Sequence, residues 1–137
     1  MKTQIPMRLI IACSLGLGFS GCVQPEFGEL RVEQRSFPPL AVEVDDEQVV
    51  LPVGIALALK VKPVSGNRQK YTSNDELEFS SDNPSVMDAF QIDQTSEVII
   101  TGVRTGNSCL RVIVNHGEVA CLDVRVIEQP VELGRDR

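Results

Sequence analysis

Residues 55–62 of this chain read Ile-Ala-Leu-Ala-Leu-Lys-Val-Lys, the clearest strand pattern in the sequence. Large apolar side chains occupy every second position, with alanine or lysine between them. Successive side chains of a β-strand point to opposite faces, so this pattern buries one face and leaves the other in solvent. The sequence therefore predicts a half-buried strand that ends at Pro63.

The same period of two recurs on both sides of this strand. Shorter alternations, separated by turn residues, occupy residues 42–44, 49–53, 77–79, 86–90, 97–101, 109–114 and 120–126. Aromatic residues make up only 4% of the chain and Trp is absent, so the core must consist of Val, Ile and Leu, which favour strands. About seven short strands on about 90 residues predict an all-β fold, an immunoglobulin-like antiparallel β-sandwich.

The N-terminus has the three-part pattern of an export signal. Two basic residues, Lys2 and Arg8, precede an apolar run at 9–19, and the small residues Ser20 and Gly21 follow it. An eleven-residue helix rises only about 16 Å, whereas a bilayer core is about 30 Å thick, so the segment is too short to span it. We expect a signal peptide at 1–21 that is cleaved; a retained anchor is the alternative.

Phe19-Ser20-Gly21-Cys22 resembles a bacterial lipobox. This resemblance implies that Cys22 becomes the acylated N-terminus and carries palmitate-type chains that hold the protein on a membrane. Cleavage before Cys13 would leave too short an apolar run, and an ordinary cleaved signal is the other alternative. Val23 follows the cysteine where Asp favours inner-membrane retention, which implies an outer-membrane location, with the domain on the periplasmic or surface face.

Cys109 and Cys121 are the two cysteines that remain for pairing. If residues 109–114 and 120–126 are the strands of one hairpin around Asn115-His116-Gly117, both cysteines lie on the face opposite the main apolar row. An exported chain is in an oxidising compartment, so we predict a cross-strand disulfide, with two free thiols as the alternative. Zinc is disfavoured because these thiolates and His116 supply three ligands where a structural site needs four.

Residues 23–39 contain three prolines, mixed charges and a weak alternation at 30–33. We predict that the lipidated N-terminus and a tether with at most one short edge strand occupy 22–39 and lift the domain off the membrane. The domain itself is expected at 40–128, and a C-terminal tail at 129–137.

Several motifs, in order and at matching spacing, carry a family resemblance: Leu51-Pro52-Val53-Gly54, Phe79-Ser80-Ser81-Asp82-Asn83-Pro84-Ser85-Val86, Val98-Ile99-Ile100-Thr101-Gly102-Val103 and Cys121-Leu122-Asp123-Val124-Arg125-Val126. The stretch from about Leu40 to Ile127 resembles the bacterial immunoglobulin-like domain of group 2, found in intimin- and invasin-type surface proteins. This resemblance implies a binding, adhesive or spacer role and transfers no catalytic residue. Gly54 and Gly106 stand where the chain must reverse with positive φ.

Composition and motifs disfavour several function classes. Two of the 13 basic residues lie in the signal, so 11 basic residues face 19 acidic ones in the mature chain, which disfavours nucleic-acid binding. No serine lies in a Gly-x-Ser-x-Gly elbow, and the lone His116 is expected in an exposed turn. The acidic clusters at 45–47 and at Asp75, Glu76 and Asp82 match no calcium loop, so we predict no metal, no cofactor and no small-molecule substrate.

The sequence thus predicts a non-enzymatic envelope lipoprotein. Its domain would act as an interaction, adhesion or assembly module at the membrane surface, with a protein of the envelope as partner. The alternative is a ligand-binding module for calcium or glycan, which would need a concave patch with aromatic platforms or converging carboxylates.

Overall fold

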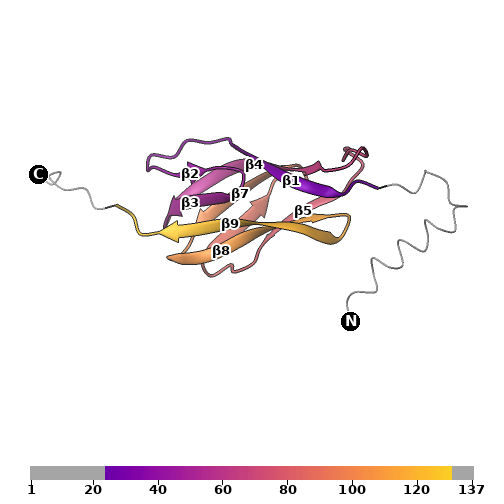
Figure 1. Cartoon of the computed structure of the whole chain (residues 1–137). Coiled ribbons are helices and arrows are strands. Elements are labelled where there is room, and N and C mark those ends of the chain that lie inside the picture. The colour runs from indigo at the N-terminus through magenta and orange to yellow at the C-terminus, as the bar shows by residue number, and fades with distance from the viewer. Residues whose placement is uncertain (1–23, 131–137) are drawn as a thin grey trace, which may run out of the picture.

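The computed structural model describes residues 24–130, and Cys13, Cys22 and the tail beyond Pro130 lie outside this part. The described chain folds into two packed β-sheets (Figure 1). Its nine strands are β1 (Phe27–Gln34), β2 (Glu43–Val44), β3 (Gln48–Pro52), β4 (Ala56–Ser65), β5 (Leu77–Ser81), β6 (Met87–Gln91), β7 (Glu97–Gly102), β8 (Gly106–Val114) and β9 (Gly117–Ile127). The all-β sandwich is confirmed, with nine strands where the sequence predicts about seven.

One sheet has the strand order β1-β4-β7-β6 and the other β2-β3-β9-β8-β5. The core between them is formed by the inward-facing aliphatic side chains that the alternation predicts. Fully buried members include Leu51, Leu57, Leu59, Ile100, Leu110 and Val112. Burial of such side chains is the main favourable term in folding, so a core almost without aromatic residues is sufficient here.

Strand β4 confirms the half-buried alternation predicted for residues 55–62. Leu57, Leu59 and Val61 have no exposed surface, while Ala56 and Lys62 face solvent. The strand does not end at Pro63 as predicted, however, but continues to Ser65. Pairing with β7 stops at Lys60, so beyond it β4 pairs only with β1, and Pro63 needs no N–H on its open side.

Strand β1 differs from the predicted tether. Its eight residues pair with β4 over almost their whole length, and Leu30 is buried in the core. Glu29, Arg31 and Glu33 face solvent between the inward positions, which makes the alternation weak in the sequence. The sandwich therefore begins at Phe27 rather than near residue 40.

One strand pair is parallel. β3 runs alongside β9 with Gln48 opposite Asp123 and Pro52 opposite Ile127, whereas the other pairs are antiparallel. β3 covers only the second half of β9, so no described strand flanks the first half of β9 on that side. The two predicted glycine positions are confirmed, with φ of 85° at Gly54 and 146° at Gly106.

The described chain enters and leaves the sandwich at opposite ends. β1 starts at the right-hand end of Figure 1, and β9 runs to the left-hand end. The β4–β5 loop and the β8–β9 turn share the right-hand end with the start of β1, because Leu77 lies opposite Val114. None of the residues from 24 to 130 forms a helix long and apolar enough to cross a membrane.

Candidate functional site

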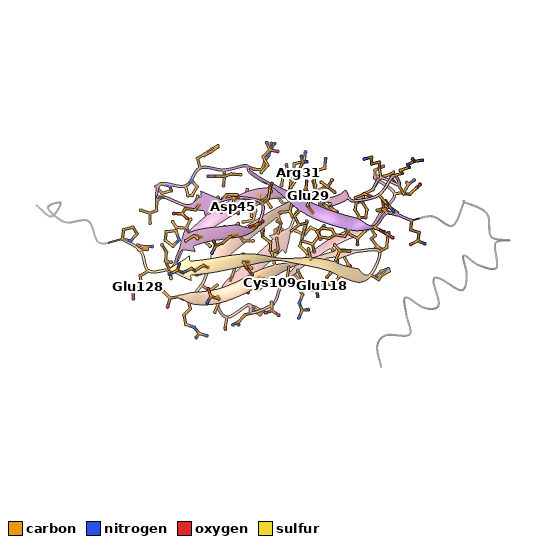
Figure 2. All side chains as sticks on the ribbon, viewed as in Figure 1. Glu29, Arg31, Asp45, Cys109, Glu118 and Glu128 are labelled. Atoms are coloured by element: carbon orange, nitrogen blue, oxygen red, sulfur yellow. A yellow bond between two sulfur atoms is a disulfide. The ribbon has the colours of Figure 1, made fainter. Side chains whose placement is uncertain are left out.

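The disulfide Cys109–Cys121 is formed on the outer face of the five-stranded sheet (Figure 2). Cys109 lies opposite Asp123 and Cys121 opposite Arg111, so the bond runs diagonally between β8 and β9, with 5.5 Å between the two Cα atoms. The neighbouring Leu110 and Leu122 are buried, which confirms that the cysteines lie on the face opposite the apolar row. The bond ties down the half of β9 that has no neighbour on its other side.

His116 lies at the tip of the β8–β9 turn with positive φ, as does Asn115. Its imidazole is 75% exposed and its Nε2 lies 3.1 Å from Glu76 Oε1. Asn115 is the more connected residue, because it accepts from Glu76 N–H at 2.8 Å and donates to Asp75 Oδ1 at 3.0 Å. This geometry joins the turn to the β4–β5 loop and contains no arrangement for nucleophilic catalysis.

The two acidic clusters do not come together. Asp45 Oδ1 accepts from the N–H groups of Glu47 and Gln48, and Asp46 Oδ1 accepts from Val32 N–H at 2.8 Å. Asp75, in the other cluster, accepts from Thr72 N–H at 2.7 Å. These carboxylates fix loops and edges, and within residues 24–130 no group of three His, Cys, Asp or Glu side chains could hold a metal ion.

Side chains obstruct one edge of each sheet, at β1 and at β5. Asp46 Oδ1 accepts a hydrogen bond from the N–H of Val32 on β1. At the opposite corner, the Gln91 side chain of β6 donates to Leu77 O at 2.7 Å and accepts from Phe79 N–H at 3.3 Å. A partner strand would have to displace these groups, so addition of a strand at β1 or β5 is disfavoured.

Two serines beneath the β5–β6 turn form a polar pair that sequence reasoning missed. Ser108 is the one buried polar residue of the described chain, and its Oγ lies 3.2 Å from Ser81 Oγ. It also accepts from Asn83 N–H at 3.0 Å. The pair holds the turn at Pro84, and neither hydroxyl faces a histidine.

An apolar row crosses the outer face of the four-stranded sheet. Ala58, Ile99 and Phe90 lie side by side on β4, β7 and β6. Phe90 is 66% exposed, and Ile99 is partly exposed. Exposed aromatic side chains are typical of protein contact surfaces, so this row is the candidate interaction surface.

A cavity of about 440 Å³ opens between the end of β4, the β4–β5 loop and the β6–β7 turn. Pro63, Leu77 and Val114 supply apolar walls, and Tyr71, the single tyrosine, lies beside Thr72, Ser73, Thr95 and Ser96. Burial, and secondarily the negative charge of Asp75, raise the pKa of Tyr71, so its hydroxyl is protonated at neutral pH. An aromatic ring with hydroxyl groups around it has the chemistry of a site for a small polyhydroxylated ligand.

Comparison with known proteins gives matches at the level of structure. No protein-family model matches the chain, and no curated protein does. Domains 5–6 of the S-layer protein SbsC superpose with a TM-score of 0.51 at 19% identity, over 74% of this chain and 48% of that one. Domains 1–6 of the surface layer protein SbsC give a TM-score of 0.52 at 20% identity, over 72% of this chain and 14% of that one.

The fold is that of S-layer protein domains. The chain spans about half the length of the two-domain SbsC structure that it matches. A likeness at this identity carries the fold alone, because one sandwich architecture hosts many functions. The resemblance to group 2 bacterial immunoglobulin-like domains, the cleavage of residues 1–21 and the lipidation of Cys22 stay predictions.

Proposed function

We propose that this chain is a non-enzymatic lipoprotein of the cell envelope, anchored through Cys22, whose sandwich is an interaction or assembly module. The exposed row of Ala58, Ile99 and Phe90 carries this proposal. Its aromatic end lies on the outer face of a sheet and has no role in the core. The likeness to domains of a surface layer protein supports it, since those domains also belong to an envelope structure.

The sequence supports the anchor: acyl chains on Cys22 would hold the protein on a membrane, and Val23 after the cysteine favours the outer membrane. Membrane fractionation tests this location. We expect the native protein to sediment with outer membranes and to enter the detergent phase of a phase-separating detergent, and the Cys22→Ser variant to be soluble or to keep its signal. A native protein released by buffer alone would refute the anchor.

Photo-crosslinking tests the interaction surface. A photoreactive amino acid at Phe90 should capture one discrete envelope protein in intact cells. The matched control is the same amino acid at Asp123, an exposed position on the outer face of the other sheet. Capture of one species at Phe90 and not at Asp123 is the expected result, and equal or absent capture at both positions would exclude the row as the contact surface.

The cavity beside Tyr71 favours a second candidate function, a ligand-binding module. Glycan is the version that the geometry supports, because calcium would need converging carboxylates and Asp75 is already engaged by Thr72 and Asn115. Calorimetric titration with envelope glycan fragments and with calcium checks both versions. A heat of binding with glycan that is lost in the Tyr71→Ala variant would favour the ligand-binding function over the interaction module.

A further inference from the structure

The first described residues are clamped to the β4–β5 loop. Asn67 Nδ2 donates to Gln24 O at 2.9 Å, and Gly66 N–H donates to Glu26 O at 2.7 Å. Asn67 Oδ1 is held by Ser65 Oγ at 2.6 Å and by Gln69 N–H at 3.1 Å. The loop and the incoming chain are therefore one structural unit.

Two glycines allow this close approach. A Cβ atom on Gly28 would lie 2.9 Å from Gly66 Cα and from Gly66 N, and one on Gly66 would lie 3.2 Å from Gly28 Cα. These contacts are with backbone atoms, which cannot swing aside as a flexible side chain would. The backbones at 28 and 66 therefore pack directly together, and the loop cannot leave the incoming chain without unpairing the start of β1.

The clamp leaves little chain between the anchor and the domain. Gln24 is two residues from Cys22, and two extended residues span at most about 7 Å. A lipidated Cys22 would lie at the level of the headgroups, which places residues 66–70 at the same level. With the proposed anchor at Cys22, residues 22–39 would not lift the domain off the membrane as the sequence predicts.

The first part of the β4–β5 loop, residues 66–70, is basic, whereas Asp75 and Glu76 lie at its other end. Arg68 and Lys70 are exposed and form no ion pair within the described part of the chain, and Lys62 on β4 is exposed at the same end. Residues 65–71 contain no acidic residue, although the mature chain is strongly acidic. Glu26 lies next to the clamp, Asp75 lines the cavity beside Tyr71, and Glu76 lies beside His116.

We propose that residues 66–70 form a membrane-contact surface, in which Arg68 and Lys70 bind the phosphate groups of anionic phospholipids around the anchor. This proposal rests on the lipid anchor of the proposed function. Each cation close to an anionic bilayer strengthens the binding of a protein to that bilayer about fivefold. Arg68 and Lys70 would therefore fix the orientation of a protein that acyl chains already hold. The sandwich then stands end-on, with the Gly102–Gly106 turn away from the lipid.

Spin-label depth measurement tests the contact. Lipidated protein with Gln69→Cys carries the label, because Cys22 is blocked by lipid and Cys109–Cys121 is oxidised, and it is reconstituted in phosphatidylglycerol vesicles. We expect a label at residue 69 to be at headgroup depth, shielded from a water-soluble relaxant. A label at Val103→Cys, at the opposite end and 48% exposed, should be fully accessible.

Charge reversal separates the loop from the anchor. Arg68→Glu with Lys70→Glu should expose the label at residue 69 at least several-fold, and vesicles of phosphatidylcholine should do the same to the native loop. The matched control, Arg104→Glu with Arg125→Glu, changes the charge equally and should leave the label shielded. The contact would be overturned if the label at residue 69 were as accessible as the label at residue 103, or if charge reversal left the shielding unchanged. In either case, flotation of the protein with vesicles would still support the anchor. Failure to float would overturn both.

Discussion

At the scale of single residues, covalent and polar links compensate for gaps in the strand pairing. Cys121 lies in the half of β9 that β3 does not cover, and the disulfide joins this half to β8. Asn115 and Ser108 act in the same way through hydrogen bonds, since each connects a turn to a neighbouring strand or loop. Stability in a small sandwich with few aromatics thus depends on a few specific side chains.

Removal of the disulfide is expected to destabilise the domain without unfolding it. A double Cys109→Ser, Cys121→Ser variant loses the restriction that a twelve-residue link places on the unfolded chain, about 3 kcal/mol in the chain-entropy model. Urea unfolding measures this loss. An unchanged midpoint, with native protein shown to lack free thiols, would mean that the link constrains nothing.

Tyr71 gives a pH-dependent signal in a chain without tryptophan. Its pKa is raised, first by burial and then by Asp75, so the folded protein holds the proton above pH 10 where the unfolded chain begins to lose it. The stability that this group contributes is present below pH 10 and is lost as the pH rises through the folded pKa. Ultraviolet titration should show a late transition that Asp75→Asn moves down only in part. A titration at the ordinary value would contradict the burial of this ring.

At the scale of strands, the sequence predicted what depends on local alternation and missed what depends on distant partners. β4 and the β8–β9 hairpin follow from period-two runs, and their buried faces are confirmed. β1 was largely missed because charged residues alternate with only Leu30 and Val32. The parallel β3–β9 pair, the Gln91 edge bridge and the Asn67 clamp join residues distant in sequence, which no local pattern reveals.

Leu30 distinguishes a strand from a tether. Leu30→Ala should destabilise the domain by about 2–4 kcal/mol, because it removes a buried side chain from the core. The control Arg31→Ala, exposed on the same strand, should change the free energy of unfolding by less than about 0.5 kcal/mol. If chemical denaturation shows equally small changes in the free energy of unfolding for both variants, residues 27–34 belong to a tether and not to the core.

At the scale of the whole molecule, the path of the chain gives the sandwich a direction. The start of the described chain lies at one end with the Asn67 clamp, and β9 delivers the chain to the other end (Figure 1). The Ala58–Ile99–Phe90 row lies on the outer face of the four-stranded sheet, between these two ends. In the proposed end-on arrangement, the row would stay open to a partner.

The mass of the intact protein, purified from its native membranes, tests the lipid anchor most directly. We predict a chain that starts at Cys22, lacks residues 1–21 and carries the added mass of a diacylglyceryl thioether on that cysteine. Tandem fragmentation should place the whole addition on Cys22, with Cys109 and Cys121 joined to each other. An unmodified chain, or one that begins at another residue, would contradict the anchor and with it the end-on arrangement of the sandwich.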